Sequence, residues 1–259
     1  MIQRSVNVIA NNICDMTWKE AEVAGKKAKF IVISTGSVEQ HGPHLPLGAD
    51  FMVASRVASE LSQEFPSIHV PLSPFGTNFA FKNWPGTISI SAKTYSRMIV
   101  EVMLSAAEIC PRIIVVNGHD ENQETLIAAA REVVQSGKAK VACFEWAKMV
   151  RDVLRTVCES RNEMHGGEGL TSLFMHWFPD HVRDDLIDIG YIRTAKLVAD
   201  DVHRDPHAFL PKILNPGDPG DSGVFGDPRL ANAEKGSRIA AALKKRSRDL
   251  VTELQWDNE

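Results

Sequence analysis

The stretch that decides both fold and site runs from residue 30 to residue 50 and reads FIVISTGSVEQHGPHLPLGAD. It opens with a short apolar, β-branched run (30–34), which is typical of a strand buried on both faces. Glu39 and His41 follow this run two residues apart, and Asp50 comes nine residues later. In extended backbone, residues i and i+2 project to the same side. We therefore expect Glu39 and His41 to face one point.

A second stretch repeats this arrangement further along the chain. The apolar run 112–116 is followed by His119 and Glu121, again two residues apart. With Asp50, the two stretches offer three carboxylates and two imidazoles, enough for two divalent cations if one carboxylate bridges them. Oxygen and nitrogen ligands of this kind suit zinc, manganese or iron(II). The sequence thus predicts a metal site at the ends of two strands.

Apolar periodicity around these stretches predicts alternating helices and strands. Helices are expected over 18–25, 51–65, 95–110 and 124–135, and strands over 30–34, 68–72, 112–116 and 139–144. Strands joined by helices at this spacing form a parallel sheet through right-handed crossovers, with sites at the carboxyl ends of the strands. We expect a three-layer α/β/α sandwich with a mostly parallel central sheet, formed by one domain over residues 1–259. The turn-rich segment 180–227 is expected to be a long loop within that domain.

This element pattern gives Asp50 an alternative role. Asp50 would lie at the N-cap of the helix 51–65, where its side chain could cap backbone amides instead of binding a metal. The companion ligands favour the metal.

Composition excludes several other classes of protein. The chain has 259 residues, 44% of them hydrophobic and 24% charged, with a net charge of -4, which gives no electrostatic reason to expect nucleic acid as a partner. A basic cluster at 244–248 lies in a helical pattern and is expected to be a solvated helix face. The chain lacks a signal-peptide pattern and any apolar run long enough for a membrane helix. Its four cysteines form no CxxC pair, so we expect reduced thiols and a cytoplasmic location.

Five stretches of the chain carry residue-specific motifs: 36–50, Trp84-Pro85-Gly86-Thr87, 117–122, His165-Gly166-Gly167-Glu168 and 226–231. In this order they resemble the motifs of the creatininase family of metal-dependent hydrolases. The resemblance spans roughly residues 15–240 and implies the same three-layer fold. Because members are commonly homo-oligomers, it also implies a hexamer or another trimer-based assembly.

The resemblance also implies a division of the ligands between two divalent metal ions. One metal would be held by Glu39, Asp50 and His119, and the second by His41, Asp50 and Glu121, so that Asp50 bridges them. A hydroxide between the metals would attack a carbonyl carbon, with a cyclic amide or formamide C–N bond of a small molecule as the first choice. The alternatives are hydrolytic C–C ring opening of a cyclic keto-polyol and a non-catalytic metal- or ligand-binding oligomer.

Two acidic positions compete for the second metal. Most relatives take its carboxylate from the position of Glu168, whereas creatininase itself takes it from the position of Glu121. Glu168 is thus a candidate ligand or general acid/base, or simply a favourable charge at a helix N-terminus. His165 matches the histidine that handles protons at the substrate, a role suited to an imidazole. His44 is expected to be a hydrogen-bond partner of the site and not a ligand.

Four further positions are candidates for substrate binding. Trp146 aligns with an aromatic residue that packs over the substrate in creatininase, although a core tryptophan explains it equally well. Arg161 replaces a second such tryptophan and could meet a carboxylate, or be an ordinary surface arginine. Lys82 and Asn83 lie in the substrate-facing loop. Met164 replaces a glutamate of creatininase, and this change, like that at Arg161, argues against creatinine as the substrate.

Overall fold

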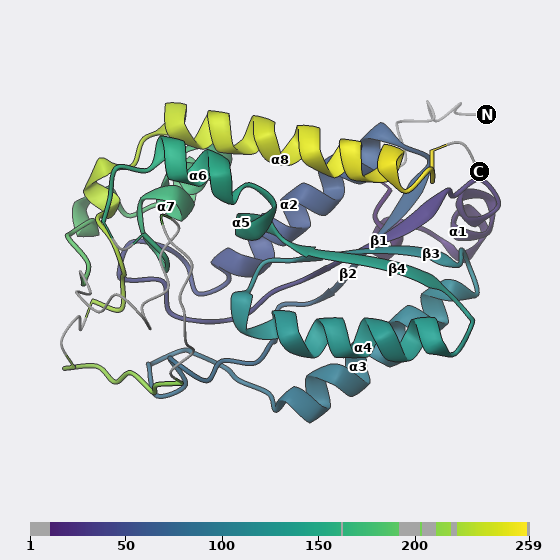
Figure 1. Cartoon of the computed structure of the whole chain (residues 1–259), viewed down its shortest axis with the longest axis horizontal. Coiled ribbons are helices and arrows are strands. Elements are labelled where there is room, and N and C mark those ends of the chain that lie inside the picture. The colour runs from purple at the N-terminus through teal and green to yellow at the C-terminus, as the bar shows by residue number, and fades with distance from the viewer. Residues whose placement is uncertain (1–10, 162, 192–202, 204–210, 219–221, 258–259) are drawn as a thin grey trace, which may run out of the picture.

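Four parallel strands form the central sheet of the protein, seen here as a computed structural model that describes residues 11–161, 163–191, 203, 211–218 and 222–257 (Figure 1). The strands are β1 (Phe30–Thr35), β2 (Ser67–Ser73), β3 (Arg112–Asn117) and β4 (Lys140–Glu145). Their order in the sheet is β2-β1-β3-β4, and every pairing is parallel. Helices lie on both faces of the sheet, so the expected α/β/α sandwich is confirmed.

The register of the strands brings their carboxyl ends to one edge. Thr35 at the end of β1 pairs with Asn117 at the end of β3, which in turn pairs with Glu145 at the end of β4. β1 is buried along its whole length and β3 nearly so, which explains why both are continuous apolar runs. The segments that follow β1, β3 and β4 therefore start side by side.

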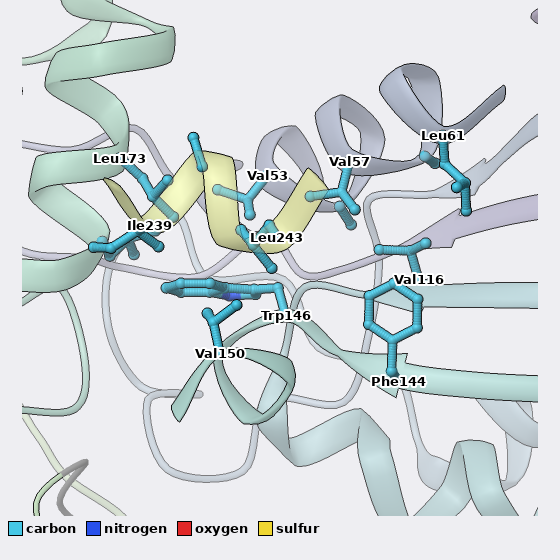
Figure 2. Packing of buried hydrophobic residues seen from close by; sticks show 14 of the residues in the cluster. Val53, Val57, Leu61, Val116, Phe144, Trp146, Val150, Leu173, Ile239 and Leu243 are labelled. Carbon is cyan, nitrogen blue, oxygen red and sulfur yellow. The ribbon is translucent and has the colours of Figure 1, made fainter. Parts of the chain in front are cut away.

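One face of the sheet is covered by five helices: α2 (Ala49–Glu64), α5 (Trp146–Met149), α6 (Arg151–Val157), α7 (Glu168–Trp177) and α8 (Ala233–Glu253). Val116 and Phe144 point from the strands into this core, where Trp146 lies between Leu243 of α8 and Val150 (Figure 2). This layer carries the larger of the two cores.

The opposite face is covered by α3 (Ala92–Ala107) and α4 (Gln123–Gln135), with α1 (Trp18–Gly25) at its margin. Alternate residues of the central strands, such as Ile31 and Ile113, pack here against Tyr95 and Leu126. Five short 3-10 helices complete the described elements: η1 (Ile13–Asp15), η2 (Asp120–Asn122), η3 (Pro179–His181), η4 (Asp184–Leu186) and η5 (Pro228–Leu230).

Each helix and strand expected from the periodicity is present, with ends shifted by up to three residues. The helices α5 and α6 were not expected, whereas α7 begins at Glu168, as the helix N-terminus considered for that residue requires. In the segment 180–227, residues 192–202, 204–210 and 219–221 lie outside the described residues, and the described remainder holds only 3-10 turns and an isolated bridge. No described helix combines the length and the apolar character needed to cross a lipid bilayer.

The N-cap role considered for Asp50 is wrong. Gly48 is the N-cap of α2, and Asp50 lies one position inside the first helical residue. As a glycine, Gly48 supplies no side-chain cap to this end of the helix. The carboxylate of Asp50 is therefore available for other partners.

Candidate metal centre

Four of the expected ligands meet at the carboxyl edge of the sheet. Glu39 and His41 follow β1, His119 follows β3, and Asp50 lies in the first turn of α2. Each is at most 6% exposed. Gly118 allows this convergence, because a β-carbon there would lie 2.0 Å from the carbonyl oxygen of Asp50.

The carboxylate of Asp50 lies at the centre of the cluster. Its Oδ1 is 3.0 Å from His41 Nε2, and its Oδ2 is 2.9 Å from His119 Nδ1. Ser37 Oγ donates a hydrogen bond of 2.8 Å to Oδ2. Because each oxygen faces a different imidazole, Asp50 has the placement that a carboxylate bridging two cations requires.

Backbone carbonyl groups orient the two imidazoles. His119 Nε2 is 2.7 Å from the carbonyl oxygen of Thr77, and His41 Nδ1 is 2.9 Å from that of Glu39. A carbonyl oxygen can only accept, so these two nitrogens carry hydrogen. The other two nitrogens, His119 Nδ1 and His41 Nε2, face Asp50, and they are the atoms that would ligate a cation at this place.

Glu39 completes the cluster. Its Oε2 lies 3.5 Å from His119 Nδ1, whereas its buried Oε1 has no hydrogen-bond partner among the described residues. Burial raises the pKa of Glu39 to about 8, in spite of the opposing charge of His119. An orphaned buried carboxylate oxygen is costly unless a cation or donor meets it, so the donor set fits a divalent cation.

The pKa values of His119 and Asp50 are both shifted in favour of the charged form of each group. Burial opposes protonation of His119, but Glu39 and Asp50 outweigh it and raise its pKa to about 10. Burial likewise opposes ionisation of Asp50, but His41 and the hydrogen bonds from both imidazoles hold its pKa below the ordinary value. The carboxylates thus require nearby positive charge.

Among the described residues, two groups of side chains could each hold a metal ion, with their ligand atoms within 4.8 Å of one another. Glu39, Asp50 and His119 form the first group, the set that the resemblance implied for one metal. Glu39, His41 and His165 form the second, which shares only His41 with the set expected for the second metal and has Glu39 and His165 in place of Asp50 and Glu121.

Glu121 lies at the wall of the cavity but turns away from this cluster. Its carboxylate accepts hydrogen bonds from the backbone N–H groups of Phe79 and Ala80, the second at 3.0 Å. The i, i+2 expectation is not met here, because Glu121 lies in η2 and not in extended backbone. Its charge still contributes to raising the pKa of Glu39 and of His119.

His165 is held in a stack of three rings. It lies between His41 and Phe81, with ring centroids 4.4 Å from each. Its Nε2 is 2.6 Å from the backbone oxygen of Gln40, so Nε2 carries hydrogen and Nδ1 faces Glu39 Oε2 at 3.9 Å. Burial and the neighbouring His41 lower the pKa of His165 to about 3. The ring therefore offers a neutral, accepting nitrogen to the cluster.

Glu168 is placed differently from the other candidates. It is fully buried, but its Oε1 pairs with Lys235, and its Oε2 accepts backbone N–H groups of Glu159 and Ser160 at 2.8 and 2.7 Å. Glu168 is absent from the described residues that line the cavity. His44 donates to or accepts from Thr171 Oγ1 at 2.9 Å and belongs to neither ligand group.

A cavity of about 150 Å³ opens over the cluster. Trp146 is 7% exposed, packs in the larger core and also contributes to the wall of the cavity. The core position is confirmed, and contact of Trp146 with a substrate stays a prediction. Arg161, Lys82 and Asn83 are exposed and do not line the cavity within the described part of the chain. Lys82 lies over the ring of Phe79, and Asn83 bonds to Asn215 at 2.7 Å.

Sequence reasoning missed several residues that line the cavity. Glu145 ends β4 beside Asn117, and burial raises its pKa to about 7. An acid directly after a predicted strand was the signal for it. Phe81 and Glu163 also line the wall, and no local pattern marks either of them.

Comparison with known proteins gives the same family as the motifs. The creatininase family profile, described as creatinine amidohydrolase, matches residues 14–251. A mycofactocin precursor peptide peptidase from Mycolicibacterium smegmatis is 30% identical, over 88% of this chain and 86% of its own. A creatinine amidohydrolase from Pseudomonas putida is 24% identical, over 92% of this chain and 95% of its own.

Solved structures share the fold. A creatinine amidohydrolase (creatininase) matches with a TM-score of 0.75 and 22% identity, over 95% of this chain and 98% of that chain. A creatininase mutant of Zn–Zn type and a manganese creatininase each match with a TM-score of 0.72 and 22% identity, over 94% and 98% of the two chains. From the family profile and the relative that is 30% identical over most of both chains, we conclude that this protein belongs to the creatininase family and is a hydrolase.

Proposed function

We propose that this protein is an amidohydrolase that uses two divalent cations to cleave the C–N bond of a small cyclic amide or formamide. The observation that carries the proposal is the carboxylate of Asp50, which lies between His41 and His119 with one oxygen toward each. The creatinine amidohydrolase and the peptidase are both named for hydrolysis of a C–N bond, which supports this choice. A 3-dehydro-scyllo-inosose hydrolase from Thermotoga maritima, 24% identical over 92% of this chain, supports C–C ring opening of a cyclic keto-polyol as the alternative.

The ligands of the first cation lie close together, whereas the third ligand of the second cation lies apart from the cluster. Glu39, Asp50 and His119 would hold one cation. His41 and Asp50 would hold the other, with Glu121 as the third ligand if its carboxylate leaves the N–H groups of Phe79 and Ala80. Zinc, manganese and iron(II) all suit these ligands. Cations at this centre would supply the ability to ionise water near pH 7 and to polarise a carbonyl group.

The chain's own residues would orient the substrate and move the proton. The Nδ1 of His165 faces the cluster, so the ring lies where it would accept a proton and return it to a leaving nitrogen. The cavity of about 150 Å³ lies below the roughly 300–1,000 Å³ of sites for drug-sized ligands, which favours a small substrate. Met164 at its wall places an apolar side chain where creatininase has a glutamate, so we expect little turnover of creatinine.

Homo-oligomeric assembly is also part of the proposal. Three large apolar side chains on the connection between β2 and α3 are 40% to 49% exposed, namely Phe75, Phe79 and Ile88. Burial of these side chains against another copy would account for their exposure here. Light scattering of the purified protein measures the size of the assembly, and a monomer at micromolar concentration would contradict this part.

Metal analysis combined with a substrate panel tests the proposed reaction. Protein loaded separately with zinc, manganese or iron(II) should hold close to two metals per chain and release ammonia or an amine from a cyclic amide or formamide. Turnover of a cyclic keto-polyol without amine release would establish C–C cleavage instead. Less than about half a metal per chain with no turnover would leave only a binding protein.

A variant at His165 separates proton transfer from metal binding. His165→Ala should lose most turnover, roughly 100- to 10,000-fold for a general acid–base, while it keeps its metal. His176→Ala is the matched control, since His176 is exposed near the end of α7 and, among the described residues, belongs neither to a ligand group nor to the cavity lining. Loss of metal from His165→Ala would show that His165 is a ligand, as its place in the second group allows.

A further inference from the structure

Two buried carboxylates close the loop that carries His165. Glu163 accepts the backbone N–H groups of Glu168 and Gly169, both at 2.8 Å. Glu168 accepts those of Glu159 and Ser160, at 2.8 and 2.7 Å. Glu163 thus holds the backbone at the end of the loop, and Glu168 holds the backbone at its start.

The loop is packed too tightly to move freely between these points. A β-carbon at Gly167 would lie 2.4 Å from Glu163 Oε2, and one at Gly226 would lie 2.6 Å from the same atom. Gly166 has φ of +60°, a conformation that favours glycine. His165 lies just before it, between the two tied points, so the carboxylates decide where its ring can lie.

Lys235 of α8 anchors the second carboxylate. Its Nζ pairs with Glu168 Oε1, lies 2.7 Å from Glu159 Oε1 and donates to the carbonyl oxygen of Leu230 at 3.1 Å. Both oxygens of Glu168 are therefore engaged, one by an ammonium group and one by two amides. Bonds of this kind, with an ionised partner, are the stronger ones in proteins.

We propose that Glu163 and Glu168 are positioning residues that hold the His165 loop, and that Glu168 acts through Lys235 instead of binding a metal or carrying a proton. The proposal rests on the proposed role of His165. If Glu168 has this role, it is not a ligand of the second metal, and Glu121 is the remaining one of the two acidic candidates. Misplacement of a reacting group by about 1 Å can cost roughly 100-fold in rate.

A double-mutant cycle distinguishes positioning from ligation. Glu168→Gln keeps the shape of the side chain but removes its charge, and Lys235→Met removes the partner. Each variant should keep the wild-type metal content and lose roughly 10- to 100-fold in kcat with little change in KM. The kcat of the double variant should be no lower than that of the less active single variant, because the two residues act as one unit. Lys235→Arg should recover much of the rate.

Glu159→Gln is the matched control. Glu159 pairs with the same ammonium group, but its side chain is 72% exposed, so this variant should stay close to wild type. Loss of metal in Glu168→Gln but not in Lys235→Met would identify Glu168 as a ligand and overturn the proposal. Multiplying losses in the double variant would also overturn it.

Hydrogen exchange tests the loop even if the proposed reaction fails. In Glu168→Gln, the amides of Glu159 and Ser160 should exchange several-fold faster, and in Glu163→Gln those of Glu168 and Gly169 should do so. Unchanged exchange at both pairs would refute the positioning role whatever the protein hydrolyses. Faster exchange in the two variants, together with a wild-type protein that holds no metal and has no turnover, would refute the proposed function and leave the positioning role standing.

Discussion

Replacing Ser37 with alanine should weaken metal binding at Asp50 and leave the fold intact. Ser37 is fully buried, and its Oγ donates a 2.8 Å hydrogen bond to Asp50 Oδ2, the oxygen that also faces His119. The substitution removes one oxygen atom and introduces no clash. Asp50 then keeps its position in α2 but loses one of the groups that orient its carboxylate.

The size of the effect follows from this bond. A hydrogen bond to a charged group contributes about 1.5–3 kcal/mol, and about 1.4 kcal/mol corresponds to a tenfold change in affinity. Partners behind a metal ligand typically change affinity by roughly 10- to 100-fold. The metal-free carboxylate also loses the bond, which offsets part of the difference, so we expect a fall near the lower end, about tenfold.

Competition with a chromophoric zinc chelator measures this affinity directly. Ser62→Ala is the matched control, because Ser62 is a buried serine of α2, the helix that carries Asp50, and its hydroxyl donates to the carbonyl oxygen of Ser59 and not to a metal ligand. The control should bind zinc as wild type does. An affinity of Ser37→Ala within about twofold of wild type, or an equal fall in Ser62→Ala, would show that Asp50 does not bind the metal as inferred.

Three further predictions concern residues outside the proposed ligand set. Burial lowers the pKa of His69 to about 4 from its ordinary 6.5, so its contribution to stability is complete above pH 6.5 and is lost as the pH falls toward 4. Between pH 7 and 5 the unfolding free energy of the wild type should fall about 2 kcal/mol more than that of His69→Gln in urea titrations, and equal falls would contradict this. Gly118→Ala should abolish metal binding, measured by metal content, because its β-carbon would overlap the backbone of Asp50, whereas Gly48→Ala meets open space and should bind normally. Phe174→Ala should lower the unfolding free energy by about 3–5 kcal/mol, since its ring is fully buried, while Leu230→Ala at a site 38% exposed should change it by under about 0.5 kcal/mol in the same titration.

The parallel sheet was readable from local pattern because its central strands are uniformly apolar. The runs 30–34 and 112–116 are buried on both faces, so their character does not depend on which face a residue takes. The helices α5 and α6 escaped prediction because they are short. The periodicity did not reveal α7 either, because its first seven residues are all buried and include polar ones such as Glu168 and Thr171. Periodicity carries little information where a helix is short or buried all round.

The sequence by itself determined the ligand types, their pairing after two strands and the layered fold, because these follow from residue chemistry and from the short range of backbone geometry. The tertiary structure decided the rest. Only the approach of α2 to the end of β3 at Gly118 places Asp50 between two imidazoles, and only the 3-10 turn η2 directs Glu121 toward Phe79 and Ala80. Glu168 faces Lys235 because α8, which begins 65 residues later, packs against α7. The direction of a charged side chain depends on partners distant in the chain, and no local pattern contains them.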